Sequence, residues 1–245
     1  KRKDTYPSKT VVEVYPFNES THFPTIDSVL WKNNALNVKS VEFRDKIRPV
    51  STARWFNGFE NATSINLKNL DTSRDTNMNK MFSYCKGLTK LDVSGLDTSQ
   101  VTDMDAMFAV CINLTNIPVS NFNTSKVKDM HSMFDSCFKL QSLDLSMFDT
   151  SNVTDFGYMF SGDKVMSTLH LTDNFVTEKA KDISGIFNDC EKLSNINVSN
   201  WNVSNVTSTE KAFANTFLLT SLDLSNWDMS NCENSQMMFY SDTAL

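Results

Sequence analysis

Residues 133–155 read MFDSCFKLQSLDLSMFDTSNVTD, and the same pattern returns along most of the 245-residue chain. The opening dipeptide sets the register, and its equivalents are Trp55-Phe56, Met81-Phe82, Met107-Phe108, Met133-Phe134, Met159-Phe160, Ile186-Phe187, Ala212-Phe213 and Met238-Phe239. Successive dipeptides keep the spacing of Phe82 and Phe108, except that the step from Phe160 to Phe187 is one residue longer. Self-similarity at a fixed period of this length predicts a solenoid in which each repeat forms one coil.

Each repeat also contains an apolar-x-apolar triplet, which predicts a short β-strand with one buried face. The triplets lie at Ile65/Leu67, Leu91/Val93, Ile117/Val119, Leu143/Leu145, Leu169/Leu171, Ile196/Val198 and Leu222/Leu224. Val41-Glu42-Phe43 fits the same pattern in an irregular first coil, so that eight strands are expected. Because one repeat cannot bury its apolar face alone, we expect these strands to pair in parallel, about 4.8 Å apart from coil to coil.

The segment that carries each anchor dipeptide predicts a short helix. Met104, Met107 and Phe108 are spaced as one helical face. Aspartates at the start of these segments are placed to cap the helices, namely Asp103, Asp129, Asp155 and Asp182. The expected fold is therefore an α/β right-handed solenoid of leucine-rich-type repeats, with a parallel β-sheet on one face, short helices on the other, and about eight coils.

Two regions follow from this register. Residues 38–245 form the repeat array, and residues 1–37 lie outside the period. The apolar residues of this first region are expected to form an N-terminal cap over the open end of the first coil: Tyr15, Phe17, Phe23, Ile26, Val29, Leu30 and Trp31. The last repeat stops halfway at Leu245, which indicates either a truncated array or an unfamiliar cap.

The repeat Met-Phe-x-x-Cys-x-x-Leu-x-x-Leu-x-Leu resembles that of the BspA-type leucine-rich repeat surface proteins over roughly residues 38–245. The resemblance implies an extracellular protein of a bacterial cell surface that adheres to host matrix or mucosal glycoproteins or to other cells. The chain departs from the pattern at residues 161–166, which lack the cysteine, and in the one extra residue before Ile186. Since the stretch 178–182 is unusually charged, we expect a bulge or kink there.

Composition excludes several classes of partner. The net charge is −6 and charged residues of both signs are spread along the chain, so no basic stripe is offered to nucleic acid or to anionic lipid. The sequence contains no run of about 18 apolar residues, and we therefore expect no membrane insertion of this chain. Hydrophobic residues make up 40%, enough for a sizeable core.

Four cysteines share one position of the repeat: Cys85, Cys111, Cys137 and Cys190. They are expected to be buried thiols that pack as small apolar residues, with oxidation between neighbours as the alternative. A zinc site is disfavoured because no Cys-x-x-Cys occurs and no histidine shares the column. Calcium is disfavoured as well, because Asp92 and Asp144 are two coils apart, about 10 Å, and cannot share one ion. No metal and no cofactor are therefore expected.

The outward residue of each strand is free of packing constraints, and this column is the candidate ligand-binding surface. Its candidate members are Asn66, Asp92, Asp144, His170, Asn197 and Asp223. The alternative is a merely solvated sheet face. A second column becomes aromatic toward the C-terminus and ends in Trp201 and Trp227, which form either a packed edge or an aromatic patch for glycans or proteins.

No catalytic constellation can be assembled, because the three histidines fall at unrelated positions of the repeat. Two functions remain. The first is a non-catalytic, monomeric binding module of a bacterial cell surface, whose partner is a host or microbial surface protein or glycan. The second is a rigid spacer that displays another domain from the cell wall. Joint substitution of Asp144, His170 and Asn197 should abolish binding under the first hypothesis and change nothing under the second.

Overall fold

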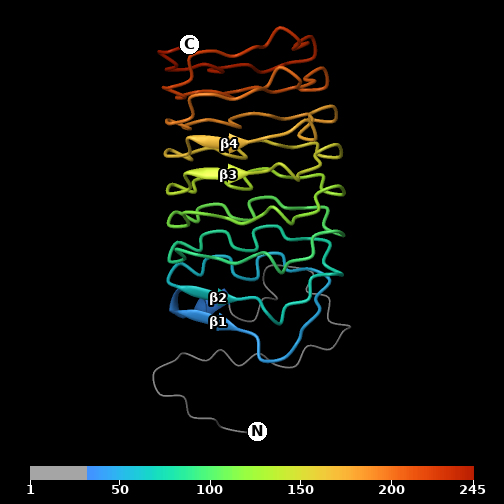
Figure 1. Ribbon diagram of the computed structural model, residues 1–245, viewed down its shortest axis with the longest axis vertical. Coiled ribbons are helices and arrows are strands. Elements are labelled where there is room, and N and C mark those ends of the chain that lie inside the picture. The colour runs from blue at the N-terminus through green and yellow to red at the C-terminus, as the bar shows by residue number, and fades with distance from the viewer. Residues whose placement is uncertain (1–31) are drawn as a thin grey trace.

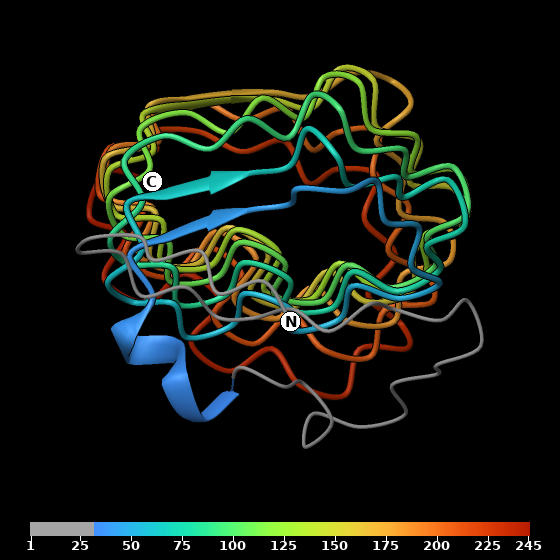
Figure 2. The same ribbon diagram turned by 90° about the horizontal axis from the view of Figure 1, so that it is seen from below.

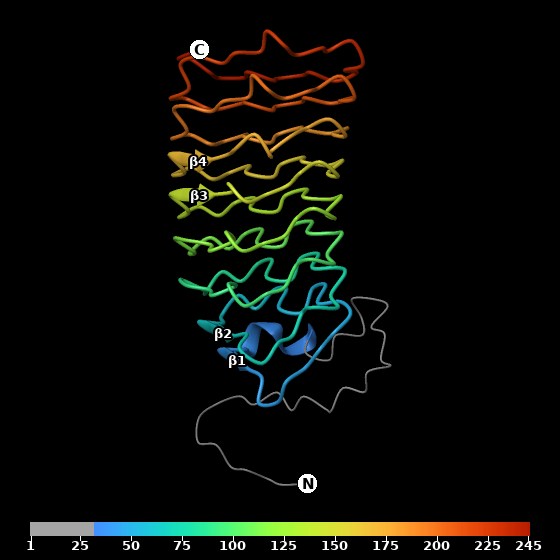
Figure 3. The ribbon, with the colours of Figure 1, turned by 45° about the vertical axis from the view of Figure 1, so that its right-hand side comes forward.

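A computed structural model describes residues 32–245 as one stack of coils (Figure 1). A 3-10 helix, η2 (Lys32–Asn37), precedes the first strand. Strand β1 (Ser40–Glu42) pairs in parallel with β2 (Ser64–Asn66), and β3 (Ser142–Asp144) pairs in parallel with β4 (Thr168–His170). All four strands lie along the same side of the stack (Figure 3). The residues expected to form the N-terminal cap lie outside the described residues, apart from η2.

The expected sheet forms only in part. In the described chain, the triplets at 91–93, 117–119, 196–198 and 222–224 are not strands, although the apolar residues of the first three are buried and those of the last are partly buried. One cause is visible at Pro118, which has no N–H to donate to a neighbouring coil. There the Val119 N–H donates locally to the Ile117 carbonyl, at 3.0 Å.

The expectation of short helices is wrong for the described residues, which contain no α-helix. The segment from Met104 is a series of β-turns, and the Met107 N–H donates to the Met104 carbonyl at 3.1 Å. The N–H groups that point along the stack donate instead to the next coil, as from Phe108 to the Met133 carbonyl at 2.9 Å. The turns also bring the apolar side chains to the inside, so the same i, i+3, i+4 spacing arises without a helix.

These turns use left-handed backbone conformations at two positions of the repeat. The first column, with φ between 50° and 62° in its non-glycine members, comprises Arg54, Lys80, Ala106, Ser132, Tyr158, Gly185, Lys211 and Met237. The second comprises Gly58, Tyr84, Val110, Ser136, Gly162, Asp189, Asn215 and Ser241. A positive φ costs an L-residue roughly 1–2 kcal/mol. The bonds between coils must offset this strain at every repeat.

The predicted anchors do line up along a common axis. The phenylalanine rings of successive coils stack with 5.3–5.9 Å between centroids. This phenylalanine ladder comprises Phe56, Phe82, Phe108, Phe134, Phe160, Phe187, Phe213 and Phe239. Viewed along the stack, the coils superimpose, with β1 and β2 on the side opposite the turns (Figure 2). The coils thus enclose one continuous core.

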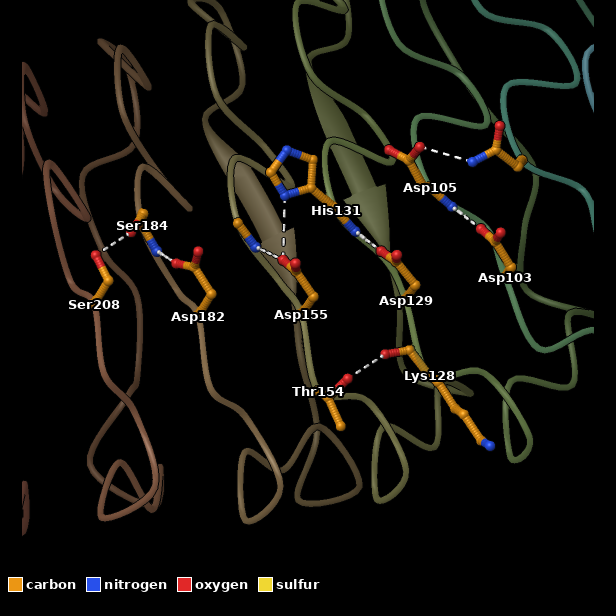
Figure 4. A network of polar contacts seen from close by, with 12 residues as sticks. Asp103, Asp105, Lys128, Asp129, His131, Thr154, Asp155, Asp182, Ser184 and Ser208 are labelled. Atoms are coloured by element: carbon orange, nitrogen blue, oxygen red, sulfur yellow. Dashed lines mark hydrogen bonds and ion pairs between the residues drawn. The ribbon is translucent and has the colours of Figure 1, made fainter. Parts of the chain in front are cut away.

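The aspartates predicted to cap helices cap turns instead. Asp103, Asp129, Asp155 and Asp182 form a ladder of backbone bridges that starts at Asn77 and continues to Asn234 (Figure 4). Each of these four carboxylates accepts a hydrogen bond from the backbone N–H two residues later, at 2.7–3.0 Å. A carboxylate does meet free N–H groups, as the sequence indicates, but in a turn of the Asx type.

The extra residue of the irregular repeat lies earlier than the charged stretch suggests. Leu145 and Leu171 keep the regular spacing of the repeat, whereas Phe148 and Phe175 are one residue further apart. The insertion therefore falls within residues 172–174, on the strand side, directly after β4. The stretch 178–182 keeps its place in the ladder, since Asp182 still pairs with Asp155.

Candidate functional site

The outward column predicted to bind a ligand is exposed along its whole length. Five of its six members also have a local role, because each accepts a hydrogen bond from the backbone N–H two residues later, at 3.0–3.1 Å: Asn66, Asp92, Asp144, Asn197 and Asp223. The sixth, His170, has its Nδ1 3.6 Å from Asp144 Oδ1. The column is thus a row of Asx turns, which leaves the second polar atom of each side chain facing solvent.

Hydrogen bonds keep the carboxylates of this column ionised. The Ser94 hydroxyl, 2.6 Å from Asp92 Oδ1, and the Ser94 N–H lower the pKa of Asp92 below its ordinary value. The Ser225 hydroxyl and N–H lower the pKa of Asp223 in the same way. At Asp144 the backbone N–H of Ser146 is the main cause of a lowered pKa. The strand face therefore carries fixed negative charges at neutral pH.

One place on the strand face is hollowed. A pocket of about 230 Å³ lies between β4 and the segment 195–201 of the next coil. Its polar lining comes from His170, Thr172, Asp173, Asn195, Asn197 and Asn200, and its apolar lining from Leu169, Leu171, Phe175, Ile196 and Trp201. The pocket therefore brings together His170 and Asn197 of the predicted column with Trp201 of the aromatic column. Asn66, Asp92, Asp144 and Asp223 do not line it.

The pocket coincides with the inserted residue. Thr172 and Asp173 lie in the loop 172–174, which contains the extra residue, and both line the pocket. Among the described residues, no backbone hydrogen bond joins 169–171 to 195–197, and none joins the regular triplets 91–93 and 117–119, whereas β3 and β4 pair directly. The longer loop is the feature that distinguishes this coil from its neighbours.

In some of the regular repeats, an asparagine side chain bridges neighbouring coils at this level. Asn121 Nδ2 donates to the Ser94 carbonyl at 2.8 Å, and Asn226 Nδ2 donates to the Ser199 carbonyl at 3.1 Å. Asn200 occupies the same position of the repeat, but its amide has no hydrogen-bond partner within the described part of the chain. Asn200 is one of the residues that line the pocket.

The two tryptophans of the aromatic column stack, with 6.3 Å between centroids and 8° between ring planes. Trp201 is only 2% exposed, and Trp227 is partly buried with its Nε1 donating to the Val198 carbonyl at 3.1 Å. The rings consequently pack into the edge of the core rather than forming an open platform. Trp201 also lines the pocket.

The opposite, turn-bearing face carries a second polar cluster (Figure 4). His131 Nδ1 lies 3.2 Å from Asp155 Oδ1, and this hydrogen bond raises the pKa of His131. Burial alone would raise the pKa of Asp155, but bonds from His131 and the Gly157 N–H lower it. Burial raises the pKa of Asp129, and the carboxylates of Asp155 and Asp103 raise it further. Every bond of this cluster closes a turn or joins neighbouring coils.

The cysteine column lies in the core. Cys85, Cys111, Cys137 and Cys190 are free and fully buried, and each thiol donates to a phenylalanine carbonyl of the preceding coil at 3.1–3.3 Å. Burial raises the pKa of Cys111 to about 12. The irregular repeat places Asp163 in this column, where Oδ1 accepts from the Cys137 N–H at 2.8 Å and Oδ2 has no partner.

Within residues 32–245, no group of three or more His, Cys, Asp or Glu side chains is arranged to hold a metal ion. No helix there has the length and apolar character needed to cross a membrane.

Four polar residues of the pocket are not members of the predicted column: Thr172, Asp173, Asn195 and Asn200. The single longer step between anchor dipeptides is the signal that could have found them, since an insertion on the strand side makes one loop longer than its neighbours. From the sequence alone, the extra residue could be placed only somewhere in the segment before Ile186.

Two overlapping stretches, residues 50–172 and 163–245, match the family model DUF285, described as a Mycoplasma protein of unknown function. The chain belongs to the DUF285 family. The two matches of this DUF285 chain meet within the irregular repeat, beside the pocket. No curated protein matches it.

Several solved structures resemble this DUF285 chain weakly. A leucine-rich repeat protein from Bacteroides ovatus is 17% identical, with a TM-score of 0.34 over 85% of this chain and 69% of that one. The plant peptide hormone receptor RGFR1, in complex with RGF2, is 13% identical, with a TM-score of 0.32 over 78% of this chain and 36% of the receptor. The functional domain of InlJ from Listeria monocytogenes, which includes a cysteine ladder, is 14% identical, with a TM-score of 0.23 over 81% and 57% of the two chains.

Proposed function

We propose that this chain is a non-catalytic binding module, displayed outside a bacterial cell, that adheres to a host or microbial surface protein or glycan through its strand face. The observation that carries the proposal is the pocket between β4 and residues 195–201. It lies beside the one stretch of the outward column where a longer loop interrupts the regular turns. The extracellular location rests on the resemblance to BspA-type repeat proteins.

The recognition chemistry fits binding rather than catalysis. The pocket combines amide, imidazole, hydroxyl and carboxylate groups with a few apolar side chains, so it offers more polar groups than the mostly apolar pockets that hold drug-sized ligands. The Nδ1 of His170 faces Asp144 at 3.6 Å on an open surface, and Thr172, the hydroxyl residue of the lining, donates its hydroxyl to the Ser146 carbonyl at 3.1 Å and not to that pair. The polar groups of the pocket can therefore orient a ligand.

The test compares two triple variants on an array of matrix proteins and glycans. Replacement of Asp144, His170 and Asn197 by alanine alters the column at the pocket. The matched control replaces Asn66, Asp92 and Asp223, which lie in the same column and close the same Asx turns elsewhere. We expect the first variant to lose binding and the control to keep it. Equal binding by both variants would contradict the proposal.

A second candidate function is a rigid spacer, and the unbroken phenylalanine ladder favours it. Stacked rings and a hydrogen-bond ladder from Asn77 to Asn234 join every coil to the next, which makes the stack stiff. A spacer needs no ligand. Absence of binding across the whole array, by a chain that is folded, would favour this function over adhesion.

A further inference from the structure

The pocket offers an unusual concentration of amides. Asn195, Asn197 and Asn200 line it from one coil, opposite His170 and Asp173. Asn197 Oδ1 accepts from the Ser199 N–H at 3.1 Å and from its hydroxyl at 2.8 Å, so the Nδ2 donors remain for a ligand. Within the described chain, the side chains of Asn195 and Asn200 make no hydrogen bond, so that both their donors and their acceptors are available. An amide donates and accepts at adjacent atoms, which matches a pair of hydroxyl groups.

The charge of the lining disfavours ions. No Lys or Arg lines the pocket, and Asp173 does, with the ionised Asp144 close to His170. An anion would therefore meet negative charge without a compensating cation. A metal ion is disfavoured too, because no group of ligating side chains in residues 32–245 is arranged to hold one. The ligand chemistry is that of a neutral, polar molecule.

The volume of the pocket and its apolar lining narrow the chemical class of the ligand further. The volume of about 230 Å³ is below the range of roughly 300–1,000 Å³ typical of pockets that hold drug-sized molecules. Phe175 and Trp201 are only 1% and 2% exposed, and Leu169 and Leu171 are only partly exposed, so the pocket presents little apolar surface to anchor an aliphatic or aromatic side chain of a peptide. One small ring that carries several hydroxyl groups fits both the size and the polarity.

From these observations we infer that the pocket binds one neutral terminal sugar residue of a glycan, through the amides of Asn195, Asn197 and Asn200. This inference rests on the proposed function and specifies its ligand. Asn200 is the residue that distinguishes this pocket from the rest of the strand face, because its equivalents Asn121 and Asn226 use their side-chain amides to bridge neighbouring coils.

The experiment uses the full chain and an array of oligosaccharides that end in neutral hexoses or N-acetylhexosamines, each beside its sialylated counterpart. Calorimetric titration with a soluble neutral oligosaccharide that binds then compares the native chain with variants. We expect Asn197→Ala and Asn200→Ala each to weaken binding about tenfold, the loss of roughly one hydrogen bond to a sugar hydroxyl. Sialylated counterparts should bind at least about tenfold more weakly than the neutral ones.

The matched control is Asn66→Ala, which removes the same kind of Asx turn in the same column, away from the pocket. It should bind sugar like the native chain. The Asn200→Ala change removes no hydrogen bond within the described chain. The variant should therefore fold like the native chain, and a melting curve checks this.

The outcomes separate the two proposals. Binding to matrix proteins that survives enzymatic deglycosylation and the Asn200→Ala change overturns the sugar site, while the adhesive function stands. Preference for sialylated glycans also overturns it. Absence of binding to sugars and proteins alike overturns both.

Discussion

Single buried polar residues mark the places where this repeat departs from its own pattern. Asp75 lies at the repeat position that Val101, Val127 and Val153 occupy elsewhere, and its side chain is fully buried. Its carboxylate accepts from the Thr52 hydroxyl at 2.6 Å and from the Asn77 N–H at 3.0 Å. Burial outweighs these bonds and raises the pKa of Asp75 to about 6.

Asp75→Asn should therefore stabilise the protein at neutral pH. A raised pKa in the folded state means that the native chain loses stability as pH rises from about 4 through about 6, by on the order of 3 kcal/mol for this group. The asparagine retains the acceptor for the Asn77 N–H, and its Nδ2 can donate to Thr52, so the pH-dependent loss should disappear. Urea unfolding at pH 4 and pH 8 measures both effects.

The control for this prediction is Asp71→Asn. Hydrogen bonds from Ser73, Lys46 and Arg48 lower the pKa of Asp71, and neutralising it should reduce stability at pH 8. If Asp75→Asn loses stability at pH 8 as Asp71→Asn does, burial of the Asp75 charge is not the dominant effect.

Backbone strain provides a second prediction at this scale. Ser132 has a φ of 52°, its hydroxyl makes no hydrogen bond within the described residues, and the equivalent position carries Gly185. Ser132→Gly should raise the free energy of unfolding by about 1 kcal/mol, because glycine adopts this conformation without steric cost. The exposed Ser120 has no positive φ, and Ser120→Gly should lower stability by roughly 0.5–1 kcal/mol. Thermal melts of the two variants should therefore shift in opposite directions.

At the scale of the elements, the irregular coil and its insertion explain the candidate site. Deletion of Asp173 restores the regular spacing of the repeat between Phe148 and Phe175. We expect the deletion to close the pocket, to let Asn200 bridge to the preceding coil as Asn226 does, and to leave the phenylalanine ladder intact. The side-chain amide of Asn200 should then give NMR signals like those of the bridging Asn226. Unchanged Asn200 signals, in a folded variant, would show that the insertion does not open the pocket.

The sequence predicted the solenoid because one spacing recurs in side chains that must be buried, and this argument holds whatever the backbone does locally. The sequence could not distinguish a short helix from a series of turns, since either conformation places Met104, Met107 and Phe108 in the core. The deciding factor is where each N–H finds its acceptor, and Phe108 finds it at Met133 in the next coil. His170 and Asn197 were predicted as site residues because they are outward and polar. Asn200 was not, because its equivalents serve only to join coils.

At the scale of the whole molecule, stability should be nearly a sum over coils and the contacts between them. Deletion of residues 109–134, one complete repeat, brings Phe108 beside Phe160 with every column kept in register. This variant should fold with native-like circular dichroism and be shorter by about 4.8 Å along the stack, measurable by small-angle X-ray scattering. Deletion of 109–121 instead shifts every column by half a repeat and should abolish cooperative unfolding. Comparable behaviour of the two deletions would contradict a core built from aligned columns.

The alignment of columns also governs how such a molecule can vary over generations. Unequal recombination between two regular repeats adds or removes a coil in frame, and the new neighbours meet the same stacked phenylalanines and the same turn-closing aspartates. The irregular coil is different, because an exchange across residues 172–174 replaces the longer loop with a regular one. The stack can therefore change length freely, while its hollow persists only in lineages that inherit that coil whole.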